Sequence, residues 1–323
     1  MSPLQQQVAD EFLQGQRKTQ WMNTLKGPLA VPEVKKIEEV CSLIWERKGK
    51  KLRSQWVFWF GEELGISSET LNLYAWAVEA IHTATLLHDD VIDKAPLRRG
   101  GASANAVFDN TLPVLSGDYL LSDAIFQLSD KGHPLLVKLM CLAVKEVTQG
   151  EVLQYESQYQ LPETQKYFEM LNRLKTSALL KWAAQVGSIL KYQKEDPTIT
   201  QLALQYGALY QFTDDLLDLR GSPTKASWQD LREGKINEAI HLLLEHESFL
   251  KRELKMDLER KHISADLLQR FQEISNRKNF QTLLDQELFQ RQERCLSTLD
   301  SFPKGKLKKN LENLIRFTVE RLF

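Results

Sequence analysis

The sequence predicts an all-α protein. Apolar residues recur at helical spacing through most of its 323 residues, and Gly and Pro are sparse, at 15 and 10. Two long stretches, from Glu33 to Ala95 and from Thr224 to Phe302, contain no proline. Proline breaks the interior of a helix, and strand-and-turn folds need frequent turn residues. We therefore expect a bundle of long helices.

Breaks in the apolar pattern divide the chain into successive predicted helices, and most prolines fall at these breaks. The first eight helices lie near residues 4–23, 33–47, 51–64, 68–94, 104–131, 134–157, 163–191 and 197–219. A polar loop follows from Gly221 to Ser227, and then more charged helices near 235–261, 263–275, 278–300 and 305–322. Because no segment has the composition of a linker or a tandem repeat, we expect one domain over residues 1–323. Its motif-bearing core covers about 45–240, and a charged helical cap covers about 241–323.

Charge and cysteine content argue against several classes of function. The chain has 42 Lys and Arg against 43 Asp and Glu, so no overall field attracts nucleic acid or an anionic membrane. Its three cysteines, Cys41, Cys141 and Cys295, are too widely spaced for a disulfide framework or a metal cluster. No signal peptide is evident, and no apolar run approaches the roughly 20 residues that span a bilayer. We expect a soluble, cytoplasmic protein with at most transient membrane contact, and we expect the Arg and Lys residues after Lys251 at the surface.

Two acidic clusters of the same form lie far apart in the chain. They are Asp89-Asp90-Val91-Ile92-Asp93 and Asp214-Asp215-Leu216-Leu217-Asp218, each an Asp-Asp-x-x-Asp within an apolar helix. On a helix the first and last carboxylates lie at i and i+4 on one face, where like charges repel. Placing them in a buried helix is costly unless they face a polar, ligand-filled cavity. A hard divalent ion such as Mg²⁺, which keeps positions open for phosphate oxygens, fits both clusters.

Basic residues gather near both acidic clusters. One basic segment, Lys48-Gly49-Lys50-Lys51-Leu52-Arg53, opens a helix; Arg98-Arg99-Gly100-Gly101 follows the first cluster, and Lys225 and Lys235 follow the second. Arg offers a fixed fork to phosphate oxygens and Lys a point charge, so the mixture indicates diphosphate binding. Within the first segment we expect Lys51 to be solvated and Lys50 and Arg53 to bind ligand. For His88, beside the first cluster, an orienting role stays open.

Eight short motifs occur in a fixed order. They are Gly-Lys-Lys-Leu-Arg (49–53), Glu-x-x-His (79–82), His-Asp-Asp-Val-Ile-Asp (88–93), Arg-Arg-Gly (98–100), Gly-Asp-Tyr-Leu-Leu (117–121), Gly-Glu-Val-Leu-Gln (150–154), Lys-Thr-Ser (175–177) and Tyr-Gln-Phe-Thr-Asp-Asp-Leu-Leu-Asp (210–218). In this order the set resembles the trans-isoprenyl (polyprenyl) diphosphate synthases, above all the bacterial long-chain octaprenyl and solanesyl type. One Asp-rich motif alone would carry little weight, whereas the ordered set is specific.

The resemblance implies a helical bundle around a deep central cavity, normally a homodimer, with the two Asp motifs facing each other across its mouth. It implies a Mg²⁺-dependent prenyltransferase that condenses isopentenyl diphosphate head-to-tail (1'-4) with an allylic diphosphate to give an all-trans product. Metal and cations would stabilise the charge that develops on the departing diphosphate. The released diphosphate would remove the final proton, so no side-chain base is needed.

The resemblance also assigns roles to residues of this chain. The allylic diphosphate would be held by Mg²⁺, three ions per site, on Asp89, Asp93 and Asp214, aided by Arg98, Lys175, Lys225 and Lys235. Isopentenyl diphosphate would bind without metal to Lys50, Arg53, His82 and Arg99. The allylic cation would be stabilised by Thr176 and Gln211, and Asp90, Asp215 and Asp218 would complete the catalytic set.

Product length is predicted from the residues that precede Asp89, because each helical turn lies about 5.4 Å deeper along the path of the growing tail. Ala84 and Thr85 are small where short-chain members of the family often carry an aromatic plug, and Ile81 lies about one turn further on. We therefore expect products longer than C15, about C30 to C45. The cavity could still be closed lower down by Trp182, Phe126 or Met140.

Three departures from the family pattern leave the expected charges intact. Ser54 stands where Pro is usual, Tyr210 where Phe is usual, and Ile236-Asn237-Glu238 where Thr-Leu-Pro is common. A farnesyl or geranylgeranyl diphosphate synthase of the same family stays an alternative. A class I terpene cyclase shares the first motif but usually has a mixed Asn, Ser and Glu set at the second, and needs no isopentenyl site. A non-catalytic subunit of a heteromeric synthase typically lacks Asp residues in one motif.

Overall fold

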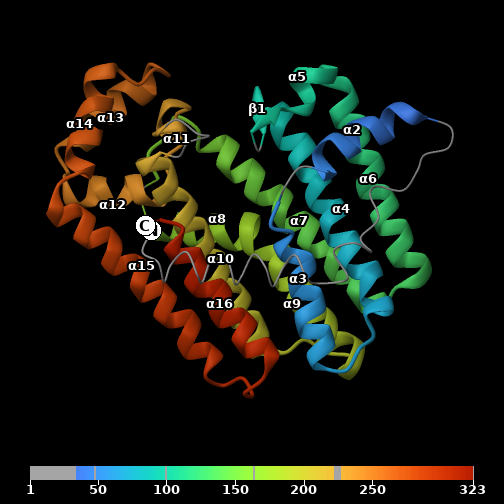
Figure 1. The fold of residues 1–323 in the computed structure, drawn as a ribbon. Coiled ribbons are helices and arrows are strands. Elements are labelled where there is room, and N and C mark those ends of the chain that lie inside the picture. Colours follow the sequence, from blue (N-terminus) through green and yellow to red (C-terminus); the bar gives the residue numbers. More distant parts are fainter. Residues whose placement is uncertain (1–33, 47–48, 99, 163, 222–226, 323) are drawn as a thin grey trace. The chain divides into compact units, whose positions relative to one another are not determined.

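The computed structural model describes residues 34–46, 49–98, 100–162, 164–221 and 227–322. These residues are almost entirely helical, with one short two-stranded hairpin (Figure 1). The predicted all-α class is therefore confirmed. The helix expected at 4–23 and the predicted site residues Arg99 and Lys225 lie outside the described residues.

The chain folds into two compact units, each named here after its acidic cluster. The described part of the Asp89 unit comprises residues 34–144 and 179–200. The described part of the Asp214 unit comprises residues 145–178 and 201–322. The single domain expected over 1–323 stays a prediction.

The Asp89 unit is built around α4, the long helix that carries the first acidic cluster. Its elements are α2 (Lys35–Trp45), α3 (Leu52–Glu63), α4 (Ser68–Ile92), β1 (Leu97–Arg98), β2 (Gly101–Ala102), α5 (Ala104–Phe108), α6 (Thr111–Lys131), the first half of α7 (Pro134–Glu156) and most of α9 (Ala178–Tyr192). Helix α4 packs against α2, α3, α5 and α6. It begins at Ser67, whose hydroxyl accepts the Thr70 N–H at 3.3 Å and so satisfies one free donor of the first turn. Buried aromatic residues of α3, including Trp56, fill the core beside it.

The Asp214 unit is built around α10, the helix of the second cluster. Its elements are the second half of α7, α8 (Gln165–Leu171), a π-helical turn η2 (Asn172–Ser177), most of α10 (Pro197–Arg220), α11 (Gln229–Arg232), α12 (Glu238–His246), α13 (Leu250–Glu259), α14 (Ala265–Ser275), α15 (Lys278–Leu299) and α16 (Lys306–Glu320). Helices α15 and α16 run side by side (Figure 1). The core is filled by Tyr206, Phe212, Trp228, Phe271 and Phe280, all fully buried.

Several predicted segments differ from the observed elements for local reasons. The helix expected over 104–131 is interrupted at Asp109, whose φ is 65° and whose carboxylate accepts the Thr111 N–H at 2.7 Å to restart the chain as α6. The loop after the first cluster forms the β1–β2 hairpin, with Gly100 at φ +78° in its turn. The helix expected over 235–261 is two helices, and α12 begins only where Asn237 caps it by accepting the Ile240 N–H at 3.0 Å. The short helix α11 was not expected.

Within the described ranges, no helix is both long and apolar enough to cross a membrane.

Candidate functional site

The first acidic cluster lies at the C-terminal end of α4, where Asp93 is the capping residue. Asp90 is fully buried, whereas Asp89 and Asp93 are partly exposed. The C-terminal end of a helix carries partial negative charge, so carboxylates there need a cation nearby. The β1–β2 hairpin brings Arg98 back to this end, and its Nε donates to Asp90 Oδ1 at 2.6 Å. The hairpin therefore positions Arg98, the predicted diphosphate ligand, directly beside the cluster.

His88 faces α6, in the same unit. Its Nε2 lies 3.1 Å from the carbonyl oxygen of Val114 and 3.3 Å from Asp118 Oδ1. A Cβ at Gly117 would collide with the imidazole ring, which gives a steric reason for glycine in the Gly-Asp-Tyr-Leu-Leu motif. His88 therefore joins two of the predicted motifs by contact, and its orienting role stays a prediction.

The basic segment at the start of α3 has one feature that the sequence did not predict. Lys50 and Arg53 are partly exposed, as ligand-binding residues must be. The expectation that Lys51 is solvated was wrong, because only 15% of its side chain is exposed. Its ammonium group lies 4.2 Å from the centroid of the Trp45 ring and 3.8 Å from Glu79 Oε2. A buried carboxylate and an aromatic face together stabilise this lysine in place of water.

Glu79 on α4 is the residue that binds the basic segment at the start of α3. It is 3% exposed, and its Oε1 accepts hydrogen bonds from the backbone N–H and the hydroxyl of Ser54, both at 3.0 Å. Sequence reasoning recorded Glu79 only as part of the Glu-x-x-His motif and gave it no role. The signal was its place in a helix that is apolar nearly all round, where a carboxylate needs buried partners. Three residues on, His82 is partly exposed on the same helix.

The predicted product-length residues lie on α4 before the cluster. Ile81 and Ala84 are buried, and Thr85 is partly exposed, its hydroxyl bonded to the carbonyl of His82 at 2.8 Å. Of the three residues proposed to close the cavity lower down, Trp182 and Met140 are buried and Phe126 is 62% exposed. Phe126 therefore cannot close an interior cavity within this chain.

The second acidic cluster, on α10, also divides by exposure. The side chain of Asp214 is 41% exposed, whereas Asp215 and Asp218 are buried. The Asp218 carboxylate accepts the backbone N–H groups of Gln229 at 3.1 Å and Asp230 at 3.3 Å, at the start of α11. Free N–H groups at a helix start bind anions, so Asp218 fixes the start of α11.

Asp215 is tied to α12 and to the residues around it. Its Oδ1 accepts the side-chain amide of Gln211 at 3.0 Å, and its Oδ2 accepts the backbone N–H of Glu238 at 3.0 Å. Burial raises the pKa of Asp215 well above its usual value, and the hydrogen bond from Gln211 opposes this shift. Glu238 is itself buried and bonds Arg291 of α15 through two hydrogen bonds of 2.7 and 3.1 Å. The cluster is thus anchored through Glu238 to α15.

The Lys-Thr-Ser motif lies in the π-helical turn η2, a form of helix that is frequent at functional sites. Lys175 donates to Gln154 at 2.5 Å and pairs with Glu151, both on α7. The hydroxyl of Thr176 donates to Gln211 at 2.8 Å. A chain of hydrogen bonds therefore runs from Thr176 through Gln211 to Asp215. Lys235, also predicted to bind diphosphate, is partly exposed and lies 3.0 Å from Glu233.

Two arginines near the end of the chain correct the expectation of a surface location. Arg291 is 8% exposed and lies 4.3 Å from the centroid of the Phe212 ring. Arg321 has 14% of its side chain exposed and donates to Asp214 Oδ1 at 2.6 Å. Sequence alone gave no signal for either contact, because both join residues far apart in the chain.

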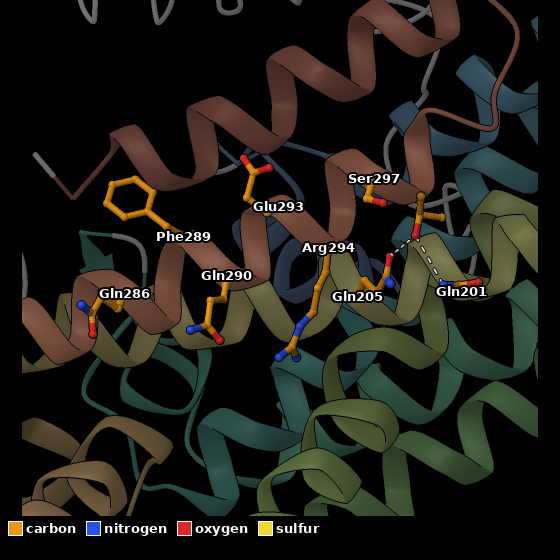
Figure 2. A pocket seen from close by; sticks show the side chains of 9 residues that line it. Gln201, Gln205, Gln286, Phe289, Gln290, Glu293, Arg294 and Ser297 are labelled. Atoms are coloured by element: carbon orange, nitrogen blue, oxygen red, sulfur yellow. Dashed lines mark hydrogen bonds between the residues drawn. The ribbon is translucent and has the colours of Figure 1, made fainter.

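An open groove of about 920 Å³ lies between α10 and α15 of the Asp214 unit (Figure 2). Apart from Phe289, its lining residues are polar or charged, and Thr298 bonds Gln205 at 2.7 Å and Gln201 at 3.4 Å along one side. None of the predicted site residues lines this groove. It is therefore separate from the candidate site.

The structure brings the predicted residues together in two sets, one in each unit. The Asp89 unit holds Lys50, Arg53, Ile81, His82, Ala84, Thr85, Asp89, Asp90, Asp93 and Arg98. The Asp214 unit holds Lys175, Thr176, Gln211, Asp214, Asp215, Asp218 and Lys235. In neither set, as far as the described residues go, do three or more His, Cys, Asp or Glu side chains form a group that could hold a metal ion by themselves.

Comparison with known proteins gives one consistent result. The family model described as "Polyprenyl synthetase" matches residues 34–275. An all-trans-nonaprenyl-diphosphate synthase (geranyl-diphosphate specific) from Rhodobacter capsulatus is 30% identical over 253 residues, which cover 76% of each chain. Octaprenyl diphosphate synthase of Escherichia coli is 32% identical over 208 residues, which cover 63% of this chain and 64% of that protein, slightly less than two thirds. The crystal structure of a decaprenyl diphosphate synthase from Rhodobacter capsulatus matches 99% of both chains, with a TM-score of 0.84 and 26% identity.

Proposed function

The chain belongs to the polyprenyl synthetase family of prenyltransferases, and from this membership we propose its reaction. The chain condenses isopentenyl diphosphate with an allylic diphosphate, head-to-tail. The product is an all-trans polyprenyl diphosphate longer than C15. The observation that carries the proposal is the division within each Asp triad. The first aspartate of each, Asp89 and Asp214, is partly exposed and able to meet a ligand. The inner carboxylates are occupied within the protein.

Asp89, Asp93 and Asp214 are the residues that we propose to hold Mg²⁺. Their chemistry fits the ion, since Mg²⁺ prefers carboxylate oxygens and is commonly held by one or two carboxylates together with substrate phosphates. Bound Mg²⁺ would supply positive charge at the departing diphosphate. Three ions per site stays a prediction from the family resemblance.

Asp90, Asp215 and Asp218 act by positioning in this proposal. Asp90 holds Arg98, Asp218 holds the start of α11, and Asp215 holds Gln211. These contacts keep the cations and dipoles in place before substrate binds. Such preorganisation lowers the barrier because the groups need not reorient when charge develops on the leaving group.

The cations of the chain complete the two proposed diphosphate sites. Beside the metal, the allylic diphosphate would bind Arg98, Lys175, Lys235 and Lys225, the last of which lies outside the described residues. Isopentenyl diphosphate would bind Lys50, Arg53, His82 and Arg99, the last again outside the described residues. Arg98 and Lys175 are held beside acidic groups of their own units, which fixes their position.

Thr176 and Gln211 are the groups that we propose to face the allylic cation. The hydroxyl of Thr176 donates to the Gln211 side chain, so the lone pairs of its oxygen are left to face positive charge. Attack by the isopentenyl double bond on C1 of the cation would form the new carbon–carbon bond. The released diphosphate would then take the proton, so no side chain serves as the base.

Several further expectations belong to the same proposal. A homodimer is supported by exposed apolar residues on α6 and α7, including Leu115, Phe126 and Leu142. A cytoplasmic location and transient membrane contact for release of product stay predictions. Of the alternatives, a class I terpene cyclase is disfavoured by the intact second Asp triad, and a non-catalytic subunit by the presence of both triads. A farnesyl or geranylgeranyl diphosphate synthase differs only in product length.

The test is incubation of the purified chain with radiolabelled isopentenyl diphosphate, Mg²⁺ and a C5, C10, C15 or C20 allylic primer, followed by chain-length analysis. We expect Mg²⁺-dependent elongation beyond C15, abolished by EDTA. A product that stops at C15 or C20 would establish the short-chain alternative. Release of diphosphate with a cyclic hydrocarbon as product would establish the cyclase, and inactivity with all four primers would overturn the proposal.

A further inference from the structure

Arg321, the residue that caps the C-terminal end of α16, reaches the second acidic cluster. Its Nη2 donates to Asp214 Oδ1 at 2.6 Å and to the carbonyl oxygen of Tyr210 at 3.3 Å. Its guanidinium lies 4.6 Å from the centroid of the Tyr210 ring. The Arg321 side chain is therefore held by a carboxylate, a carbonyl oxygen and an aromatic face, whereas an ordinary surface ion pair has only the carboxylate contact.

Arg321 contacts the partly exposed aspartate of the triad. The buried members, Asp215 and Asp218, accept backbone N–H groups at the starts of α12 and α11. Asp214 accepts a full guanidinium charge, although it is the partly exposed member. Arg321 therefore brings a permanent positive charge to this carboxylate, because the guanidinium of arginine is not deprotonated in proteins.

A metal ion and Arg321 would need the same carboxylate. A guanidinium 2.6 Å from the carboxylate oxygen neutralises the charge that attracts the ion, and it repels any cation that approaches the same group. Asp214 also keeps its orientation through this contact while no metal is bound. The ion pair thus opposes metal binding by its charge, while it keeps the Asp214 carboxylate oriented for a metal ion.

We propose that Arg321 is a positioning residue that acts as an internal counter-ion of Asp214. Its guanidinium stays paired with the Asp214 carboxylate until a metal ion and diphosphate displace it. Arg321 thereby sets the Mg²⁺ concentration at which the site fills. This rests on the proposed role of Asp214 as a metal ligand. Tyr210, which replaces the usual Phe of the family pattern, supplies both the carbonyl and the ring that hold Arg321. The C-terminal helix is thereby coupled to metal binding.

The experiment measures thermal unfolding of the full chain with inorganic pyrophosphate at fixed concentration while Mg²⁺ is varied. Ligands that bind the native state raise the unfolding temperature by mass action, so the curve yields the Mg²⁺ concentration at half effect. We expect Arg321→Ala to lower that concentration about twofold to fivefold, the range that corresponds to a partly exposed ion pair. Arg321→Lys, which keeps the charge but loses the fork, should fall between Arg321→Ala and the wild type.

Arg316→Ala is the matched control, because Arg316 lies exposed on the same helix. It should leave the half-effect concentration unchanged. A purely structural Arg321 would lower the unfolding temperature equally at every Mg²⁺ concentration in the Ala variant, and that result would overturn the proposal. So would a higher half-effect concentration, which would make Arg321 a ligand of the pyrophosphate instead.

Asp214→Asn separates this proposal from the one on which it rests. If that variant needs more Mg²⁺ while Arg321→Ala behaves as the wild type, the metal role of Asp214 stands and the counter-ion is refuted. If Asp214→Asn leaves the half-effect concentration unchanged, the metal role itself fails. In the double variant Asp214→Asn/Arg321→Ala, loss of Arg321 should no longer lower the Mg²⁺ requirement.

Discussion

Ser54 donates its backbone N–H to Glu79 Oε1 at 3.0 Å, and the single proton of its hydroxyl is shared between the same oxygen at 3.0 Å and the carbonyl oxygen of Lys51 at 2.8 Å. Both residues are buried, at 0% and 3% exposure. Proline, usual at this position in the family, has no N–H and no hydroxyl to give. The departure at Ser54 therefore adds two donors that tie the start of α3, with its basic segment, to the helix of the first Asp cluster.

Ser54→Ala tests the hydroxyl donor. The substitution keeps the backbone N–H but leaves Glu79 with fewer donors in a buried site, so we expect the free energy of unfolding to fall by about 1–2 kcal/mol. Urea unfolding followed by circular dichroism gives the value. Ser129→Ala, at an exposed position on α6, should change it by less than about 0.5 kcal/mol. Equal effects of the two substitutions would mean that the hydrogen bond to Glu79 contributes nothing net.

A second departure from the family pattern follows the same principle. Glu238 stands where proline is common, and its backbone N–H donates to Asp215 Oδ2 at 3.0 Å. Its side chain extends the connection to Arg291. At both positions, replacement of proline frees an N–H that binds a buried carboxylate of a site motif. At Ser54 and Glu238, a residue that donates hydrogen bonds therefore stands in place of a rigid proline. Neither departure removes a charge that faces the ligand.

Arg291→Met is expected to destabilise the protein strongly. It leaves the carboxylate of Glu238 buried without its bidentate partner, and breaking such a pair from one side costs about 3–5 kcal/mol. The double variant Glu238→Gln/Arg291→Met should recover part of this loss, because no unpaired charge is left buried. Arg294→Met, exposed on the same helix, is the control and should be nearly neutral. Calorimetry on the wild type, the two single variants Glu238→Gln and Arg291→Met, and the double variant measures the coupling, and a double variant that simply adds the two losses would contradict it.

The sequence was most informative where local signals decide the structure. Helix α4 was predicted within two residues because Ser67 caps its start and the acidic cluster marks its end. The buried contacts of Lys51, Arg291 and Arg321 could not be predicted, since each depends on a partner brought near by tertiary folding. Long cationic side chains usually reach solvent, and only the surrounding packing shows when one is held inside.

The acidic clusters show the same limit within one motif. Their spacing predicted that Asp89 and Asp93 share a helical face, but spacing cannot tell that Asp215 and Asp218 are occupied by backbone N–H groups. The π-helical turn at Lys175 was likewise predicted only as helix, and the close approach of Gly150 on α7 to this turn is a tertiary contact that spacing does not show. The sequence motifs therefore predicted where the site lies. Tertiary contacts determine which aspartates of the two clusters are buried and which are partly exposed.

Exposed and buried aspartates should respond differently to substitution. Asp89→Asn removes a proposed metal ligand and should lower activity about 100-fold or more with little change in unfolding temperature. Asp218→Ala removes the acceptor for the N–H groups of Gln229 and Asp230, and should lower the free energy of unfolding by about 2 kcal/mol. Prenyl transfer and thermal unfolding are measured on the same preparations. If Asp89→Asn is the less stable of the two, the division of roles by exposure is wrong.

The three cysteines should differ in reactivity toward iodoacetamide. Burial raises the pKa of Cys41 and of Cys295 to about 12 each, so at pH 8 almost none of either thiol is the reactive thiolate. Cys141 is exposed. Mass spectrometry of the native protein should show one labelled site at Cys141, and none in a Cys141→Ser variant. All three sites should react in guanidinium chloride, which is the positive control; native labelling at Cys295 would show that α15 opens more readily than its packing implies.

Ala84→Phe tests how product length is set. Ala84 lies five residues before Asp89 on α4 and is 1% exposed, so a phenyl ring there must enter the space into which the growing tail is proposed to descend. We expect shorter products, of C15 or C20, together with a loss of about 1–3 kcal/mol from overpacking. Ala75→Phe is the matched control, since Ala75 is also buried on α4 but lies nine residues earlier, half a turn round the helix and on its opposite face. It should show the same kind of destabilisation with product length unchanged. Chromatography of the dephosphorylated products decides the matter: if Ala84→Phe makes the wild-type product, the tail does not pass this residue, and length is fixed elsewhere in the chain.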